Sequence, residues 1–264
     1  MRSVHDVLCR VISNERAADG LHVMRLEAPE LASSVGCGQF IHMEMPTLQS
    51  HILRRPFSVY DAHPESGTID ILYQVVGTGS ASMVGWENGF MVRAIGPIGS
   101  TWTPPQDARR VLLVGGGVGA APLLLLCKML LGRGVDVKVV LGASTADALV
   151  CKGRYSDVCG CEPDCSTDDG TYGAKGFATA LVEAALKDAM EDEPFDYAAI
   201  CGPEPLMKAA SAMTLEVGIP TQVSMERRMA CGIGACLSCV VDTTEGKRRA
   251  CVDGPIFDAK EVVW

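Results

Sequence analysis

The chain has 264 residues, of which 48% are hydrophobic, and a formal net charge of -9 at pH 7. This length and hydrophobic content suffice for more than one folded domain and exclude a largely disordered chain. The acidic balance offers no basic surface to a phosphate backbone, so we expect no nucleic-acid partner.

The N-terminus contains no apolar stretch with the length of an export signal or a membrane span. The most apolar run, Pro122 to Leu131, covers about half a membrane span and contains Lys128. We therefore expect a cytoplasmic protein without membrane insertion. Twelve cysteines in such a protein indicate reduced thiols and metal ligands, because disulfide scaffolds are typical of short exported chains.

The first hundred residues carry short β-type segments separated by Gly, Pro, Asn and Ser. The expected strands are Leu21–Leu26, Gln39–Met45, Phe57–Asp61, Thr68–Val75 and Phe90–Ile95. This series predicts an antiparallel β-barrel or sandwich over residues 1–103. The polar, proline-bearing stretch from Thr103 to Asp107 predicts a domain boundary.

From residue 108 the pattern changes to strand, turn and helix. The expected strands are Val111–Val114, Val137–Leu141 and Tyr197–Ile200, and the expected helices are Ala120–Leu131, Thr179–Met190 and one that begins at Glu204. This alternation predicts a parallel, doubly wound α/β domain over residues 108–219. Residues 220–264 are short and glycine-rich, so we expect a small third domain built around a bound inorganic group. The expected fold class is a multidomain α+β protein.

Four cysteines in the last segment have the spacing C-x4-C-x2-C-x11-C. They are Cys231, Cys236, Cys239 and Cys251. The first three match the spacing of plant-type 2Fe–2S ferredoxins, and Gly232 and Gly234 suit a loop that wraps a cluster. The alternative is a zinc site with four cysteine ligands, but such sites usually have two C-x2-C knuckles, and this segment has one. The spacing favours a 2Fe–2S cluster.

The other cysteines match no ligand pattern. We interpret the stretch CKGRYSDVCGCEPDC, which contains Cys151, Cys159, Cys161 and Cys165, as a reduced, partly exposed loop. Three more stand among apolar residues and are expected to be small core side chains: Cys9, Cys37 and Cys127.

A glycine-rich turn follows the strand at 111–114. Its residues are Gly115, Gly116, Gly117, Val118 and Gly119. A turn of this kind between strand and helix suits a pyrophosphate, although a merely tight turn is the alternative. A second loop, Cys201-Gly202-Pro203, ends a later strand of the same sheet, so the two loops should face one crevice. Residues 142–147 contain no arginine for a 2′-phosphate, which favours NAD over NADP.

An iron–sulfur cluster transfers single electrons and a nicotinamide accepts a hydride, so a flavin is expected between them. Arg54-Arg55-Pro56-Phe57-Ser58 offers guanidinium groups to a phosphate and polar groups to a ring. Gly77-Thr78-Gly79-Ser80 precedes an expected helix and suits a pyrophosphate. The alternatives are surface charges and a simple turn.

With these motifs the sequence resembles the ferredoxin–NADP reductase superfamily. More narrowly, it is similar to the electron-transfer subunits of class 1B dihydroorotate dehydrogenase. The narrower resemblance covers essentially the whole chain and rests on RRPFS, YQVVGTGS, GGGVGAAPL, STDDGTYGAKGF, CGPEPLM, MACGIGACLSC and RACVDGPIF. One departure is Thr78, where the family often has a basic residue.

The resemblance implies three cofactors. FAD would be contacted by Arg55, Pro56, Phe57, Ser58, Leu72, Tyr73, Gln74, Gly79 and Ser80. NAD would bind through its pyrophosphate at Gly115–Gly119, with Cys201, Gly202 and Pro203 beside the nicotinamide. The 2Fe–2S cluster would be held by the four clustered cysteines.

The resemblance also implies an oxidoreductase subunit of pyrimidine biosynthesis with no catalytic residue of its own. An FMN-containing catalytic subunit would oxidise dihydroorotate, in a heterotetramer with two copies of each chain. Electrons would then pass through the 2Fe–2S cluster and FAD to NAD⁺. The alternatives are a subunit of a related sulfide dehydrogenase, ferredoxin:NADP oxidoreductase or hydrogenase, and a zinc-stabilised nucleotide-binding regulator.

Overall fold

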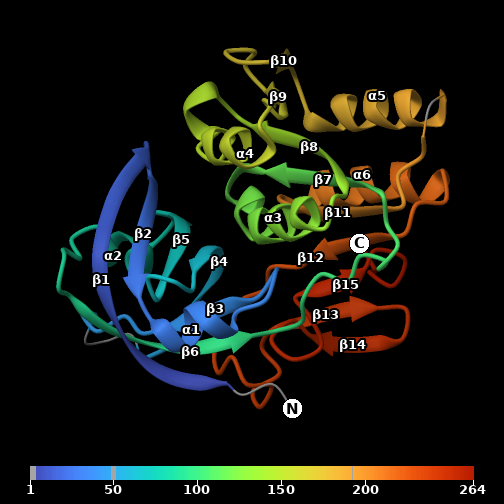
Figure 1. Cartoon of the computed structure of the whole chain (residues 1–264). Coiled ribbons are helices and arrows are strands. Elements are labelled where there is room, and N and C mark those ends of the chain that lie inside the picture. The colour runs from blue at the N-terminus through green and yellow to red at the C-terminus, as the bar shows by residue number, and fades with distance from the viewer. Residues whose placement is uncertain (1–3, 49–51, 192) are drawn as a thin grey trace.

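The computed structural model describes residues 4–48, 52–191 and 193–264 (Figure 1). The N-terminal part is a closed antiparallel barrel with the strand order β1-β2-β5-β4-β3-β6. Its elements are β1 (His5–Ala18), β2 (Leu21–Glu27), α1 (Pro29–Ser34), β3 (Phe40–Met43), β4 (Arg55–His63), β5 (Thr68–Gln74), α2 (Thr78–Met83) and β6 (Met91–Ile98). The structure confirms the predicted barrel.

Alternating side chains explain why these segments close into a barrel. Every second residue of a strand points inward, so Met24 and Leu26 on β2 meet Ile69 and Ile71 on β5 in one apolar core. Strand β1 was not among the expected strands. Only its first half alternates with buried residues, and none of the residues in its second half is buried.

The second part is a seven-stranded sheet with the order β10-β9-β8-β7-β11-β12-β15. All neighbours pair in parallel except β12 and β15. Its elements are β7 (Arg110–Gly116), the 3₁₀ segment η1 (Gly117–Leu123), α3 (Leu124–Gly132), β8 (Asp136–Ala143), the 3₁₀ turn η2 (Ala146–Ala148), α4 (Lys152–Cys159), β9 (Asp164–Thr167), β10 (Ala174–Lys175), α5 (Ala178–Glu191), β11 (Tyr197–Cys201), α6 (Glu204–Glu216), β12 (Thr221–Ser224) and β15 (Ile256–Asp258).

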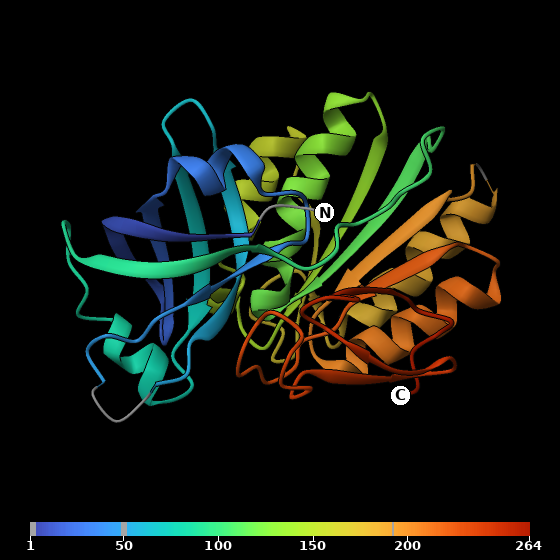
Figure 2. The ribbon, with the colours of Figure 1, turned by 90° about the horizontal axis from the view of Figure 1, so that it is seen from below.

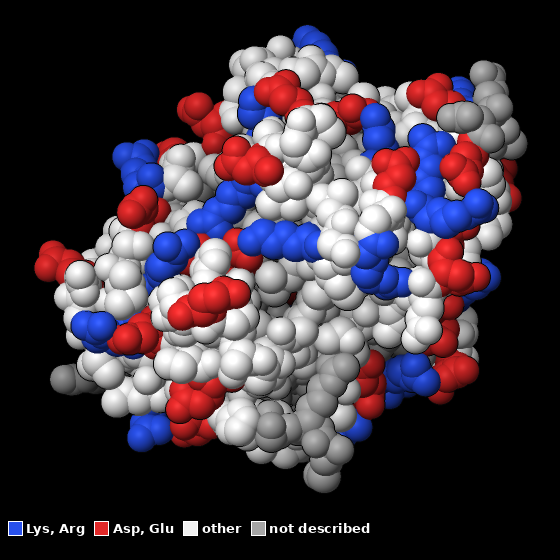
Figure 3. All heavy atoms as spheres, viewed as in Figure 1, with Lys and Arg blue, Asp and Glu red and all other residues white. Residues whose placement is uncertain are grey.

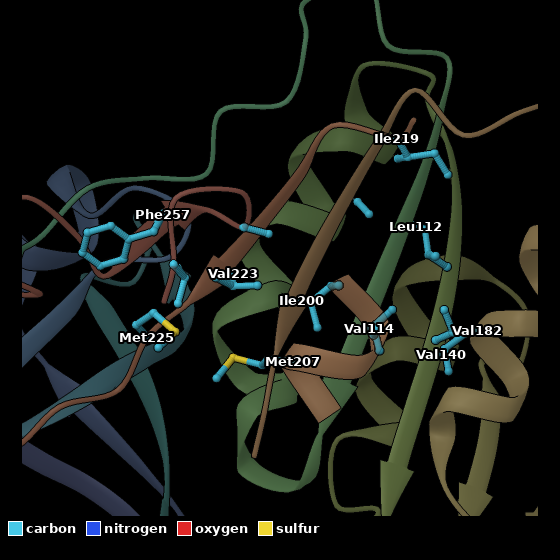
Figure 4. Packing of buried hydrophobic residues seen from close by; sticks show 14 of the residues in the cluster. Leu112, Val114, Val140, Val182, Ile200, Met207, Ile219, Val223, Met225 and Phe257 are labelled. Atoms are coloured by element: carbon cyan, nitrogen blue, oxygen red, sulfur yellow. The ribbon is translucent and has the colours of Figure 1, made fainter. Parts of the chain in front are cut away.

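Helices cover both faces of this sheet, as the doubly wound prediction requires. Strand β7 is buried on both sides, which explains its unbroken apolar sequence. Leu112 and Val114 point toward α5 and α6 and pack with Val182 and Met207 (Figure 4). Val111 and Leu113 point to the other side, where α3 and α4 cover the sheet. No helix in the described part of the chain is long and apolar enough to cross a membrane.

The expected helix at 120–131 begins differently in the structure. Residues 117–123 form the 3₁₀ segment η1, and the α-helix α3 starts only at Leu124. Pro122 explains the delay, because proline has no N–H for the helical ladder and clashes with the preceding turn.

The interpretation of the CKGRYSDVCGCEPDC stretch as a loop is wrong. It forms α4 and leads into β9. Cys151 and Cys165 are buried, Cys159 is half-buried with its Sγ 3.6 Å from that of Cys127, and Cys161 is exposed. Of the three thiols expected in the core, Cys9 and Cys127 are buried and Cys37 is half-buried.

The C-terminal segment, residues 220–264, lies beside both the barrel and the large sheet (Figure 2). It contains the hairpin formed by β13 (Val240–Thr243) and β14 (Gly246–Arg249). Strands β12 and β15 follow residue 219 and complete the large sheet, so the sheet continues past the predicted domain boundary. Phe40 and Ile98 of the barrel share an apolar cluster with Phe257 of β15, so this segment packs against barrel and sheet at once.

A network of charged side chains joins the barrel to the helices α3 and α4. Asp70, fully buried on β5, accepts hydrogen bonds from Arg25 at 2.7 and 2.9 Å and pairs with Arg154 of α4 at 2.7 Å. Lys128 of α3 contacts both carboxylate oxygens of buried Asp61 at 2.6 and 2.7 Å. Elsewhere on the face seen in Figure 3, acidic and basic side chains are interspersed.

The Asp70→Asn variant should lower the free energy of unfolding by about 2–3 kcal/mol. This is less than the full cost of breaking a buried ion pair, because the Arg25 side chain is 40% exposed. Burial works against ionisation of Asp70, but Arg25 and Arg154 lower its pKa below the usual 3.8. Its contribution is therefore complete above that value and is lost on acidification. Denaturant unfolding should show the wild type and variant converging below about pH 4. An exposed-carboxylate control, Asp188→Asn, should match the wild type, and a pH-independent gap would contradict this role.

Candidate functional site

The β13–β14 hairpin brings together the last two of the four clustered cysteines. Cys239 precedes β13 and Cys251 follows β14, and the amide of Ala250 donates to the carbonyl of Cys239 at 2.8 Å. Their Sγ atoms lie 3.3 Å apart and both residues are buried. The long C-x11-C spacing is thus the length of a hairpin that places two thiols side by side.

The first cysteine lies in a loop whose amides point at its sulfur. Partial burial opposes ionisation of Cys231, but the N–H groups of Ile233, Cys236 and Ala235 and the Cys236 thiol outweigh it and lower the pKa of Cys231 to about 6. Because amide donors stabilise the thiolate, the loop is prepared for a sulfur ligand of a metal.

The buried pair behaves differently. Burial and the neighbouring Cys239 thiol raise the pKa of Cys251 to about 12, although the amide of Gly234 acts in the opposite direction. When a metal binds, both thiols lose their protons, and the positive charge of the metal would stabilise the two thiolates.

The arrangement of the sulfurs suits two metal ions better than one. A zinc ion with four cysteines, each Zn–S about 2.3 Å, draws all four sulfurs to within about 4 Å of one another. In the described residues, no three of these thiols come within 4.8 Å of one another. Cys239 and Cys251 form one close pair, and Cys236 lies near enough to Cys231 to lower the pKa of its thiol. The four thiols thus form two pairs, which fits a 2Fe–2S cluster with two ligands on each iron.

Backbone conformation and close packing explain the glycines of this loop. Gly232 and Gly234 have positive φ values of 69° and 83°. A Cβ on Gly232 would lie 2.7 Å from Nδ1 of His42, and one on Gly234 would lie 2.6 Å from Cγ2 of Val252. The Arg249 guanidinium donates to the carbonyl of Gly234 at 3.3 Å and is held by Asp253. The loop is therefore fixed from both sides.

The two predicted flavin motifs meet at Arg55 and Gly79. A Cβ on Gly79 would lie 3.3 Å from Nε of Arg55, so the guanidinium of β4 lies against the first turn of α2. The two neighbouring arginines differ in their partners. Arg54 pairs with Glu44 at 2.6 Å, whereas Arg55 forms no ion pair within the described ranges. Arg55 is thus the arginine available to an anion.

The remaining predicted flavin residues fall into two groups. Pro56, Phe57 and Ser58 are half-buried and Gln74 is exposed, so their side chains can contact a ligand. Leu72 is buried where the barrel meets the sheet. Two side chains are already engaged. Tyr73 points into the barrel core with its hydroxyl on Asn14, and the Ser80 hydroxyl accepts from the amides of Val76 and Gly77, so these residues offer mainly their backbone.

The two predicted nucleotide loops lie in direct contact. Strands β7 and β11 pair with Cys201 opposite Gly115. A Cβ on Gly119 would lie 2.6 Å from Cα of Gly202, and one on Gly116 would lie 2.8 Å from Cδ of Pro203. Gly117 has a φ of 54°, and a Cβ there would meet nothing within 4 Å. The loops form one edge at the carboxyl ends of adjacent strands, where such sheets bind ligands.

The sequence motifs did not include His42, a polar residue in the strand segment QFIHM that the structure places at the cluster loop. Arg249 stood in the motif RACVDGPIF, but its role in holding the loop through Gly234 was not predicted. A histidine inside a buried strand was the available signal for His42.

Comparison with known proteins gives a consistent result. Residues 226–263 match a family model described as the iron-sulfur cluster binding domain of dihydroorotate dehydrogenase B. A curated protein from Desulforamulus reducens, named "Dihydroorotate dehydrogenase B (NAD(+)), electron transfer subunit", is 34% identical over 97% of this chain and 97% of its own length. A protein of the same name from Bacillus pumilus is 36% identical over 96% of both chains. The chain belongs to this family of electron transfer subunits.

Solved structures agree on the architecture. An NADH-dependent reduced ferredoxin–NADP oxidoreductase, studied for flavin-based electron bifurcation, has a TM-score of 0.85 and 29% identity over 98% of this chain and 90% of the other. A ferredoxin NADP⁺ reductase from Neisseria gonorrhoeae, solved with FAD and NADP, shares the fold with a TM-score of 0.67 and 16% identity over 81% and 92% of the two chains.

The Gly119→Ala variant should weaken the use of NADH at least tenfold in kcat/KM, because the added Cβ would push the 201–203 loop away from the glycine turn. The rate of flavin reduction by NADH in stopped-flow experiments measures the effect. Gly153→Ala, with nothing within 4 Å of the added Cβ, is the matched control and should behave like the wild type. Equal activity of both variants would show that the contact between the loops is irrelevant to nucleotide use.

Proposed function

We propose that this chain carries electrons from an FMN-containing catalytic subunit, which oxidises dihydroorotate to orotate, to NAD⁺. The proposed assembly contains two copies of each subunit and acts in the cytoplasm, where thiols stay reduced. The observation that carries the proposal is the arrangement of four cysteines in a segment that matches the cluster-binding domain of dihydroorotate dehydrogenase B. The names of the full-length relatives support the same reaction.

In this proposal the chain holds three redox groups and performs no bond-breaking chemistry on dihydroorotate. When bound, the 2Fe–2S cluster supplies one-electron transfer, FAD exchanges one or two electrons, and NAD⁺ accepts a hydride. Cys231, Cys236, Cys239 and Cys251 hold the cluster. Arg55 would hold the FAD phosphates by its charge, Pro56–Ser58 and Gln74 would contact the ring, and Gly79 and Ser80 would contribute their backbone. The loops at 115–119 and 201–203 hold the nucleotide.

An apolar patch around the cluster loop supports the presence of a protein partner. Ile233 and Leu237 are 61% and 64% exposed, and Val252 is 47% exposed. They lie on the loop between the cysteine ligands and directly after Cys251. Exposed apolar side chains at a point where electrons must enter favour a docking surface for the catalytic subunit.

The related bifurcating enzyme supports a second candidate. Its chain has the same architecture over 98% of this one, so a role in a ferredoxin–NADP oxidoreductase is the alternative. The two functions differ in the electron donor and in the partner subunit. Dihydroorotate-dependent NAD⁺ reduction by the anaerobically purified complex separates them.

The Cys236→Ser variant of that complex should abolish dihydroorotate-dependent NAD⁺ reduction while NADH still reduces FAD, because only the entry route is lost. The assay follows NADH formation, and EPR reports the cluster. Cys161→Ser, which removes another exposed thiol outside the cluster, is the control and should retain both activities. Normal electron flow in the Cys236 variant without a cluster signal would refute the route.

The Leu237→Asp variant should retain its cluster but bind the catalytic subunit at least tenfold more weakly, because a charge would be buried in an apolar interface. Leu237 has a φ of 57°, a conformation that aspartate tolerates, so the loop should keep its shape. Binding is measured by titration of the isolated subunits. Val217→Asp, 41% exposed at the end of α6, is the control. Unchanged binding for Leu237→Asp would exclude this patch from the interface.

A further inference from the structure

His42 is a buried polar side chain for which the barrel provides no partner. It is fully buried on β3, and neither of its ring nitrogens has a hydrogen-bond partner in the described part of the chain. An unpartnered buried polar atom is destabilising, and such atoms are rare in native proteins. A histidine at this position needs a reason other than packing.

The position of His42 connects the flavin motif to the cluster loop. On β3 it pairs with Pro56 of β4, inside the RPFS motif. On the other side, its Nδ1 would lie 2.7 Å from a Cβ on Gly232, so the ring packs directly against the residue after Cys231. The backbone of Arg54 and that of Cys231 lie near the ring, but neither forms a hydrogen bond with its nitrogens. One side chain thus spans from the flavin strand to the first cluster ligand.

The ring of His42 can act as a hydrogen-bond donor. An imidazole carries at least one ring N–H in either protonation state. Because the ring packs against Gly232, the cluster loop is the neighbour that offers sulfur and carbonyl acceptors.

We propose that His42 is a positioning residue for the cluster, which donates a ring N–H into the cluster-binding loop at Cys231. This inference rests on the proposed function, since it requires the cluster. A donor beside a sulfur ligand stabilises the more negative, reduced cluster, so His42 raises the reduction potential of the cluster. It also holds Cys231 against the strand that carries the flavin motif.

The test is an EPR-monitored redox titration of the cofactor-loaded chain. His42→Leu, which has no donor, should decrease the ratio of reduced to oxidised cluster at a fixed ambient potential about tenfold, a shift of about 59 mV for a one-electron couple. His42→Asn places an amide donor near the position of Nδ1 and should recover most of the shift. The FAD potential should stay unchanged in both. A wild-type potential in His42→Leu, or equal shifts in both variants, would overturn the role of the donor.

A second measurement covers the case in which His42→Leu loses its cluster. In the wild type labelled with ¹⁵N-histidine, NMR should show one ring N–H that resists exchange with D₂O and shifts when the cluster is reduced, and this signal should be absent from His42→Asn. No protected ring N–H would overturn the proposal. Absence of any cluster signal from the wild type would instead contradict the proposed function, so the two failures are distinguishable.

Discussion

The main constraint on this structure is that four thiols must lie close together in a segment that has no large core of its own. A loop and a hairpin carry these thiols. The β13–β14 hairpin places Cys239 beside Cys251. A glycine-containing loop carries Cys231 and Cys236, and its amides point at the sulfur of Cys231. Once ionised, two thiolates this close repel each other unless a cation lies between them. The segment is therefore built for a metal group, and its folding and its function depend on the same contacts.

The C-terminal segment connects the barrel to the large sheet. Phe257 of β15 packs with Phe40 and Ile98 of the barrel, and β15 itself pairs with β12 at the edge of the large sheet. On another side, Asp61 and Asp70 of the barrel pair with Lys128 and Arg154 of the sheet helices. The three regions are thus joined by apolar and ionic contacts. In the proposed function the chain supplies no catalytic acid or base, and its contribution is to fix the relative positions of three redox groups.

The sequence predicted those parts of the fold that depend on local patterns. Alternation predicted most barrel strands, and the apolar segment at 111–114 predicted the buried central strand. Cysteine spacing identified the four thiols that the structure places on one loop and one hairpin, and their role as ligands stays a prediction. Features that depend on tertiary contacts were missed. Helix α4 is polar enough to resemble a loop, Pro122 delays α3, and the pairing of β15 with β12 has no local signal.

In the candidate site, too, the sequence predicted local motifs but not the contacts between them. The motifs at 55–58 and 77–80 were predicted separately, but only the structure shows Arg55 against Gly79 and the Ser80 hydroxyl engaged with its own turn. His42 lies 190 positions before Gly232, and no local pattern connects them. Contacts of that separation follow from the packing of the barrel on the C-terminal segment.

The central claim is that four cysteines hold a 2Fe–2S cluster, and chemical analysis of the anaerobically purified chain tests it most directly. The account predicts two iron atoms and two acid-labile sulfides for each chain, with a visible spectrum that contains flavin and cluster bands. One zinc ion for each chain, without iron or labile sulfide, would contradict it.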